Sequence, residues 1–138
     1  MNLLQPISNN KALTDLSLLA ARVGLSLIFI LAGMNKIQQY EGTAQYMDAM
    51  GVPGALLPLV IALEVGGGLL ILLGGFTQLM ALALAGFCLA SAFIFHFDLG
   101  DQGQFINFFK NIAMSGGFLA VAAAGAGKFS IDSKLIKE

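Results

Sequence analysis

Four apolar segments constrain this chain more than any other feature of its sequence. They cover residues 16–37, 55–75, 77–97 and 105–125, and each is about 21 or 22 residues long. A helix of that length rises about 30 Å, the hydrocarbon thickness of a bilayer. Only 11% of the 138 residues are charged, well below the share in an ordinary soluble domain, and the mean hydropathy is +0.83. The sequence therefore predicts an all-α integral membrane protein with four transmembrane helices.

The short second connection predicts that these helices alternate in direction. The second and third segments meet at residues 74–76, Gly-Gly-Phe, which is typical of a tight antiparallel turn. Thr77 is the expected N-cap of the helix that follows. We therefore predict an antiparallel four-helix bundle, formed as a single domain by residues 1–138.

The longest connection, over residues 38–54, predicts an additional short helix. It contains the run TAQYMDAMGVP, in which Thr43 is an expected N-cap and Gly51 is expected to end the helix. Tyr46 and Met47 fall on one side of this helix. We expect it to lie at the membrane interface, over one end of the bundle, between the first and second transmembrane helices.

Charge and cysteine content exclude several classes of function. The net charge of −1 gives no broad basic surface, so nucleic acid is not an expected partner. Cys88 is the only cysteine, so the chain has neither an internal disulfide nor a CxxC pair. His96 is the only histidine, which excludes a bis-histidine haem within one chain, and we expect no metal site.

The distribution of lysines predicts the orientation in the membrane. Cytoplasmic flanks of membrane proteins carry an excess of lysine and arginine. The loops on one side of the predicted bundle are acidic, whereas both terminal segments are basic. We therefore expect cytoplasmic N- and C-termini, although Lys36 and Lys110 near the opposite side count against this. The terminal lysines are Lys11, Lys128, Lys134 and Lys137, and the acidic loop residues are Glu41, Asp48, Asp98 and Asp101.

Glu64 is one carboxylate within IALEVGGGLLILLGG, a run that is otherwise apolar or glycine. At about 100° per residue it shares a helix side with Gly67 and Gly68, and small residues let another helix approach closely. Glu64 is therefore expected to point into the bundle. The other segments also confine their polar residues to one side each, which favours a shared polar interior. Those residues are Arg22, Ser26 and Lys36 on the first segment, Gln78 and His96 on the third, and Asn107, Lys110 and Asn111 on the fourth.

Depth in the membrane predicts which of these side chains meet. At about 1.5 Å per residue Glu64 falls near mid-membrane, and Arg22 falls roughly 7 Å toward the cytoplasmic side. The other polar candidates fall in the outer half. A lone carboxylate at mid-membrane costs about 2.5 to 3.5 kcal/mol, so Glu64 is expected to pair with Lys36 or Lys110, with Arg22 as an alternative. Such a pair either fixes helix packing or serves a ligand or proton. The candidate ligand-binding or proton-relay residues are Glu64, His96, Lys36, Lys110, Asn111 and Arg22.

The order of several short runs resembles that of the DoxX family of small bacterial membrane proteins. These runs are ARVGLSLIFILAGMNKI, EGTAQYMDAMGVP, ALEVGGGLLILLGGFTQ, FHFD, NFFKN and GKFSID, which together extend over residues 20–132. The resemblance implies a four-helix protein of the bacterial inner membrane, and the six candidate residues match recurring polar positions of the family. It also implies a link to membrane oxidoreductase assemblies, including thiosulfate:quinone oxidoreductase, although many members have no assigned reaction.

Three functions are compatible with these observations. The first is a membrane subunit of an oxidoreductase, with a quinone or similar small molecule bound in the outer half of the bundle. Its partners would be a redox protein, the lipid bilayer and a second copy of the chain. The second is a non-catalytic anchor that organises a partner protein. The third is a proton-coupled transporter, since a mid-membrane carboxylate is typical of such carriers. The sequence leaves open whether this chain is itself catalytic.

Overall fold

The computed structural model describes residues 3–136, whose regular secondary structure is entirely helical. Four stretches are long and apolar enough to cross a membrane, namely Lys11–Gln38, Gly54–Leu73, Thr77–Phe95 and Gln102–Ala124. The predicted all-α fold with four candidate membrane spans is therefore confirmed. In chain order the elements are α1 (Lys11–Gln38), α2 (Tyr40–Ala49), η1 (Gly54–Leu56), α3 (Leu57–Ile61), η2 (Ala62–Gly66), α4 (Gly67–Leu73), α5 (Thr77–Phe95), α6 (Gln102–Ala124) and α7 (Ile131–Leu135).

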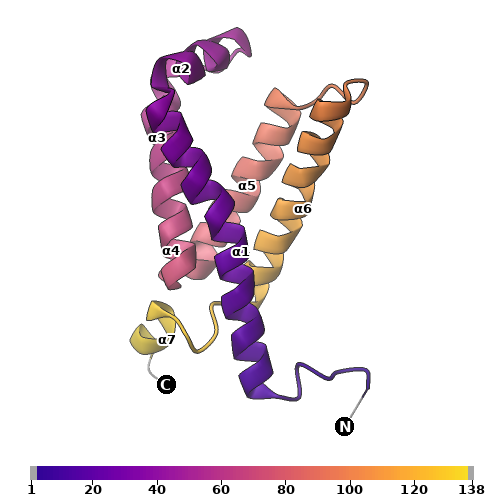
Figure 1. Ribbon diagram of the computed structural model, residues 1–138. Helices are drawn as coiled ribbons and strands as arrows, with labels where there is room; N and C mark the ends of the chain where they lie inside the picture. Colours follow the sequence, from indigo (N-terminus) through magenta and orange to yellow (C-terminus); the bar gives the residue numbers. More distant parts are fainter. Residues whose placement is uncertain (1–2, 137–138) are drawn as a thin grey trace.

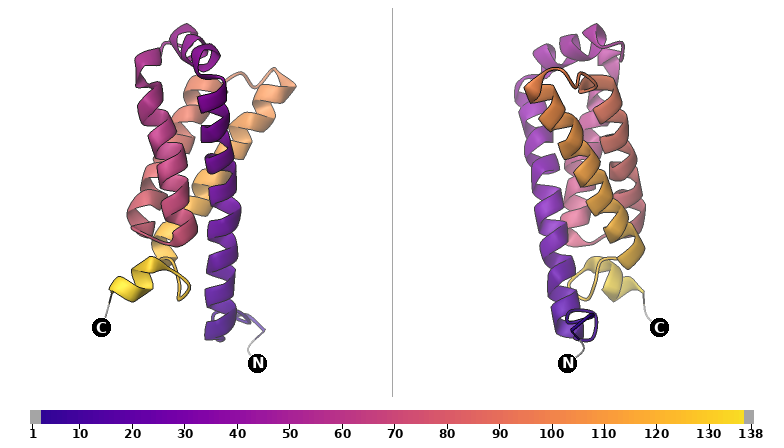
Figure 2. Two further views of the ribbon diagram at one scale, coloured as in Figure 1. Left: turned by 60° about the vertical axis from the view of Figure 1, so that its left-hand side comes forward. Right: turned by 90° about the vertical axis from the view of Figure 1, so that its right-hand side faces the viewer.

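The four spans pack as two pairs. α1 packs against the second span, which is built from η1, α3, η2 and α4, and α5 packs against α6 (Figure 1). The pairs converge near α7 and diverge toward α2, as Figures 1 and 2 show from different sides. We refer to these as the α7 end and the α2 end. Both termini lie at the α7 end.

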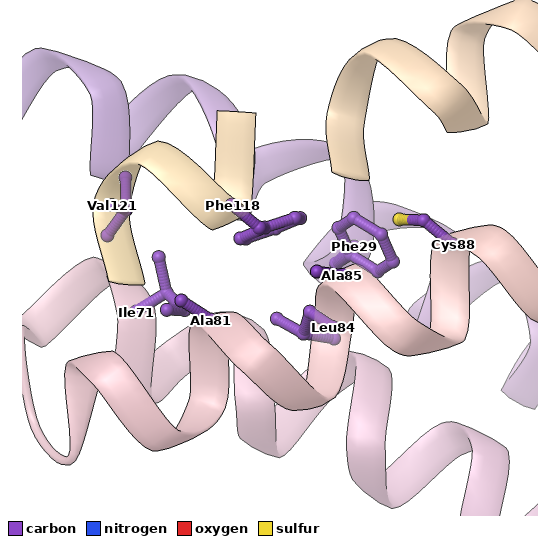
Figure 3. Packing of buried hydrophobic residues seen from close by; sticks show 8 residues of the cluster. All are labelled: Phe29, Ile71, Ala81, Leu84, Ala85, Cys88, Phe118 and Val121. Atoms are coloured by element: carbon purple, nitrogen blue, oxygen red, sulfur yellow. The ribbon is translucent and has the colours of Figure 1, made fainter. Parts of the chain in front are cut away.

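An apolar cluster holds the two pairs together. Phe29 of α1 meets Phe118 of α6 edge to face, with ring centroids 5.4 Å apart, and it makes a second edge-to-face contact with Phe87 of α5 at 6.2 Å. Edge-to-face contacts of this kind are favourable beyond the area that they bury. The cluster contains Phe29, Ile71, Ala81, Leu84, Ala85, Cys88, Phe118 and Val121 (Figure 3).

Glycines set the distance between α1 and the second span. A Cβ added at Gly68 would come 2.8 Å from Ile30 Cγ1 and 3.4 Å from the Ser26 carbonyl oxygen, so the two helix backbones are nearly in contact. Gly33 packs in the same way against Val65. Because lipid tails are as apolar as the helix surfaces, close packing of this kind is a main source of helix association in membranes. Of the small residues predicted on one side of the second span, Gly68 therefore faces α1, whereas Gly67 faces Leu84 of α5.

Two of the spanning helices, α1 and α6, begin several residues before the apolar segments predicted for them. α1 starts at Lys11 because the Asn10 side chain accepts a hydrogen bond from the Leu13 amide (3.2 Å). α6 starts at Gln102 because Asp101 accepts one from the Gln104 amide (3.0 Å). Polar caps thus initiate both helices outside the hydrocarbon-like stretch.

The two predicted threonine N-caps are wrong. α2 begins at Tyr40, with only Gln39 between it and the end of α1, so Thr43 lies inside the helix and its hydroxyl donates to the Gln39 carbonyl (2.8 Å). Thr77 is the first residue of α5 rather than its cap. The side chain that caps the N-terminus of α5 belongs instead to Asp132 of α7. Its carboxylate accepts hydrogen bonds from the backbone N–H groups of Phe76 and Thr77, each 2.8 Å long. A residue distant in sequence has taken the role expected of the local threonine.

Charges are distributed unequally between the two ends. Lys11 of α1, Lys134 of α7 and Lys128 of the segment between α6 and α7 lie at the α7 end, whereas the acidic residues of α2 and of the α5–α6 loop lie at the α2 end (Figure 1). Lys137, the fourth terminal lysine of the predicted orientation, lies outside the described residues.

Candidate functional site

The centre of the candidate site is an ion pair between Lys36 and Glu64. Lys36 Nζ lies 2.9 Å from Glu64 Oε1 and 3.1 Å from Oε2, so the ammonium contacts both carboxylate oxygens. The Glu64 side chain is 3% exposed and that of Lys36 is 28% exposed. Of the pairings left open by the sequence, the structure contains the one with Lys36. The pair joins the end of α1 to the middle of the second span.

Glu64 occupies a π-helical turn, η2, in which the helix is locally widened. The turn covers Ala62–Gly66 and interrupts the α-helical hydrogen bonding between α3 and α4. Single π turns are rare within α-helices and are frequently found at functional sites. Gly67 and Gly68 of α4 follow at once, and they add no side chain where Leu84 of α5 and Ile30 of α1 pack. The carboxylate is thus presented at an irregular, densely packed point of the span.

Two cavities meet at this ion pair. The first has a volume of about 320 Å³ and lies between α2, the second span and α5, with mostly apolar walls. The second has a volume of about 200 Å³ and extends from the pair toward α1 and α6, with more polar walls. We refer to them as cavity 1 and cavity 2. Both are lined by Lys36, Glu64, Phe87, Ser91 and His96.

Cavity 1 is covered by the short helix α2. Thr43, Tyr46 and Met47 line it from this side, and Tyr46 stacks on Phe95 of α5 with ring centroids 5.6 Å apart. The remaining apolar wall comes from Val52, from Val60 of α3 and from aliphatic and phenylalanine side chains of α5. Such a space, apolar along most of its wall and polar at one point, suits a flat apolar ring with a few polar atoms.

His96 lies where α5 ends, at its C-cap, rather than within the helix. Its ring Nδ1 lies 2.6 Å from Gln104 Oε1 of α6. When Nδ1 carries the hydrogen and donates to that oxygen, the other ring nitrogen of a neutral imidazole is an acceptor. This contact also ties α5 to α6 at the mouth of the two cavities.

Cavity 2 brings together the polar residues predicted on the outer half of the bundle. Lys110 and Asn111 of α6 line it beside Lys36, Glu64 and His96. Five of the six candidate residues therefore line one cavity. The helical spacing and predicted depth had indicated that they would face a common interior.

Arg22 is the candidate that the structure separates from the others. It lies 14 residues before Lys36 on α1, which is about 21 Å along the helix. Its guanidinium donates to the carbonyl oxygens of Ile71 (3.3 Å), Leu72 (3.0 Å) and Phe129. Because the carbonyls that end a helix have no partner within it, Arg22 closes the C-terminal end of α4 and ties it to the segment before α7. It lies at the α7 end and contacts neither cavity.

Several residues of the site were not singled out by sequence. Ser91 and Phe87 lie on α5 in an apolar run, and Gln104 precedes the apolar part of α6. Phe95 likewise lines cavity 1, whereas Phe93, Phe97 and Phe108 pack against one another between α5 and α6. Ser91 lies four residues after Phe87, on the same side of α5, but helical periodicity places it about 140° from His96, so its spacing gives no signal that it belongs to the site.

Comparison with known proteins places this arrangement in a family. The DoxX family model matches residues 17–97, which is more than half of the chain and includes most of α1 and all of α2, the second span and α5. The chain belongs to the DoxX family. Its site is therefore the polar interior of a DoxX bundle, with contributions from α6 beyond the matched residues.

Relatives of this DoxX protein are themselves described as membrane proteins. It is 51% identical to inner membrane protein YqjF of Escherichia coli strain K12 over 93% of its length and 98% of that protein. It is 40% identical to inner membrane protein YphA of the same strain, over 85% and 89% of the two chains. A third relative, 31% identical over 51% of this chain and 53% of its own, is a Bacillus subtilis strain 168 protein named "Putative oxidoreductase CatD". No solved structure matches the chain.

Proposed function

We propose that this DoxX protein is a membrane subunit of an oxidoreductase system and that cavity 1 binds the head group of a quinone. The observation that carries the proposal is that an apolar cavity of about 320 Å³ ends at a buried ion pair and a histidine. A quinone presents an apolar ring and two carbonyl oxygens. The ring would lie between Phe87 and the aliphatic wall, and one oxygen would accept a hydrogen bond from Lys36. The free ring nitrogen of neutral His96 would accept a hydrogen bond from a hydroxyl of the quinol.

Proton chemistry is the second support for a quinone. Reduction of a quinone to a quinol takes up two electrons and two protons. Glu64 and Lys36 are proton-exchanging groups at the inner limit of cavity 1, and His96 lies nearer the α2 end. The chain has no CxxC pair, so a redox partner protein would exchange the electrons. The name of the Bacillus relative agrees with this class of reaction.

The location follows from the relatives and from charge. Both Escherichia coli relatives are named inner membrane proteins, and we assign this chain to the bacterial inner membrane as well. The lysines at the α7 end favour cytoplasmic termini, which would open the cavities toward the outer half of the membrane.

Retention and binding of quinone test the proposal. The protein is purified in mild detergent, and extracted lipids are analysed for quinone. Binding of a short-chain ubiquinone analogue to quinone-free protein is then followed by its effect on the melting temperature. We expect stabilisation of the wild type and a loss of that effect in Glu64→Gln. Thr77→Val, which removes a buried hydroxyl at the α7 end outside both cavities, is the matched control. A wild-type protein that neither retains nor responds to quinone would contradict the proposal.

One observation favours a second function, that of a non-catalytic anchor for a partner protein. The Lys36–Glu64 pair joins α1 to the second span, and such a pair could serve helix packing alone. In that case Glu64→Gln lowers the melting temperature, yet a complex formed in cells still assembles and works whenever the variant is folded. Loss of function in a folded Glu64→Gln protein excludes this role.

A further inference from the structure

Lys110 of α6 is an exposed lysine that forms no ion pair within residues 3–136. It lies eight residues after α6 begins at Gln102, which is about 12 Å into the helix. Within residues 3–136 the ion pairs are Lys11–Asp15 and Lys36–Glu64, and no hydrogen bond to a protein group occupies the Lys110 ammonium. Charged side chains at such depth are costly and are generally paired or turned toward a polar cavity. Lys110 lines cavity 2.

The groups beside Lys110 add further hydrogen-bond donors. One N–H of the Asn111 side chain donates to the Asn107 carbonyl oxygen (3.1 Å), which leaves its second N–H unused. The Asn107 side-chain amide lines the same cavity and makes no hydrogen bond with the described residues. Two amides and one ammonium on one face of α6 thus converge on a single space.

The formal charge of cavity 2 is positive. Two lysines and one glutamate line it, which gives +1. The contact of Lys36 with both oxygens of Glu64 offsets one positive charge, so the charge that remains is that of Lys110. Cavity 1, by contrast, contains only the neutralised pair and has mainly apolar walls. The two cavities are therefore suited to different chemical groups.

We propose that cavity 2 is a binding site for an oxyanion, such as phosphate, sulfate or a carboxylate, held by Lys110, Asn107 and Asn111. A charged donor and neutral amide donors around a space of about 200 Å³ match the acceptor oxygens of such a group. The oxyanion is either a free ion or the phosphate of an anionic lipid that enters between the helices. This site needs no quinone, so its test is independent of the test of the proposed function.

The experiment uses inorganic phosphate and defined lipids as probes. Cys88 is fully buried and is the only cysteine, so a thiol-reactive fluorescent dye reports unfolding directly. Melting temperatures are measured in neutral detergent with sodium phosphate against sodium chloride of equal ionic strength. A second series uses nanodiscs of phosphatidylcholine with or without phosphatidylglycerol. The variants are Lys110→Gln, Asn111→Ala and, as a control with the same charge change, Lys134→Gln in α7.

We expect a concentration-dependent stabilisation of the wild type by phosphate, by phosphatidylglycerol, or by both. Stabilisation by phosphate identifies a free oxyanion as a ligand, and stabilisation by phosphatidylglycerol alone identifies a lipid head group. Lys110→Gln should weaken the apparent affinity on the order of tenfold, Asn111→Ala should weaken it less, and Lys134→Gln should leave it unchanged. The proposal is overturned if neither probe stabilises the wild type, or if Lys110→Gln and Asn111→Ala both respond as the wild type does.

Discussion

Gly33 of α1 packs directly against Val65 of the π-helical turn, since a Cβ added at Gly33 would come 2.5 Å from Val65 Cγ2 and 3.3 Å from Glu64 Cβ. Gly33 lies three residues before Lys36, on nearly the same side of α1. The close approach that this glycine permits is therefore what brings the Lys36 ammonium within reach of Glu64. Packing and charge pairing at the centre of the site depend on the same contact.

Replacing Gly33 with alanine is expected to destabilise the protein. The new methyl group forces α1 away from η2, and overpacking of this kind typically costs about 1 to 3 kcal/mol. Gly24→Ala on the same helix is the matched control, because a Cβ there meets no atom within 4 Å. Thermal melts followed with a thiol-reactive dye should show a lower melting temperature for Gly33→Ala and an unchanged or higher one for Gly24→Ala. Equal melting temperatures for the two variants would contradict the packing role.

Variants of the Lys36–Glu64 pair can separate its contribution to stability from its contribution to ligand binding. Glu64→Leu alone leaves the Lys36 ammonium without its partner, and breaking a buried pair costs about 3 to 5 kcal/mol, less here because Lys36 is partly exposed. Lys36→Met combined with Glu64→Leu removes both charges, and apolar replacements of a buried pair are often neutral or stabilising. We expect the double variant to melt near the wild-type temperature and to bind no quinone analogue.

The same double variant has an outcome that would refute the assigned ligand role. If the protein lacking both charges is stable and still binds the quinone analogue with wild-type affinity, the pair serves helix packing only. Measuring both the melting temperature and the binding isotherm on one preparation keeps the two effects apart.

Much of this architecture could be predicted from local sequence. Segment length and apolar composition predict the four spans, and helical periodicity predicts that Glu64, Lys36 and His96 face one interior, which the shared cavities agree with. The partner of Glu64 could not be chosen in this way. Lys36 and Lys110 both fall in the predicted outer half, and only the close packing at Gly33 brings α1 rather than α6 to the carboxylate.

The features that sequence reasoning missed depend on contacts between distant elements. The π turn at Glu64 has no local sequence signal, because its residues are all compatible with an ordinary α-helix. The N-cap of α5 comes from Asp132, 55 residues later in the chain than Thr77. Arg22 shares a helix side with Lys36, but periodicity does not show that the chain after α6 returns to cover it.

Arg22 is expected to contribute to stability and not to ligand binding. Two nitrogens of its guanidinium donate hydrogen bonds to three carbonyl oxygens. A lysine ammonium carries all of its donors on one nitrogen, so it cannot reproduce this arrangement of donors. Arg22→Lys should therefore lower the melting temperature by several degrees, since a loss on the order of 1 to 2 kcal/mol shifts a domain of this size by that amount. The affinity of folded protein for a quinone analogue should stay unchanged. Weaker binding at an unaltered melting temperature would instead place Arg22 in the functional site.

Asp132 makes the α7 end sensitive to acid. Burial by itself raises the pKa of its carboxyl, but hydrogen bonds from the Thr77 and Phe76 N–H groups and the charge of Arg22 outweigh burial and hold the pKa below the ordinary value of 3.8. A carboxyl whose pKa is lower in the folded protein than in the unfolded chain stabilises the fold above the unfolded pKa. That stabilisation is lost as the pH falls below 3.8 toward the folded pKa.

Asp132→Asn should therefore flatten the dependence of stability on pH at the acid end. We expect the wild-type melting temperature to fall more steeply than that of Asp132→Asn as the pH is lowered from about 5 to about 3, while the variant is the less stable protein at neutral pH. Asp98→Asn is the control, because Asp98 lies in the α5–α6 loop and its side chain caps no helix within the described residues. Parallel melting curves for the wild type and Asp132→Asn across this range would show that the carboxylate does not link α7 to the start of α5 in the way that its hydrogen bonds indicate.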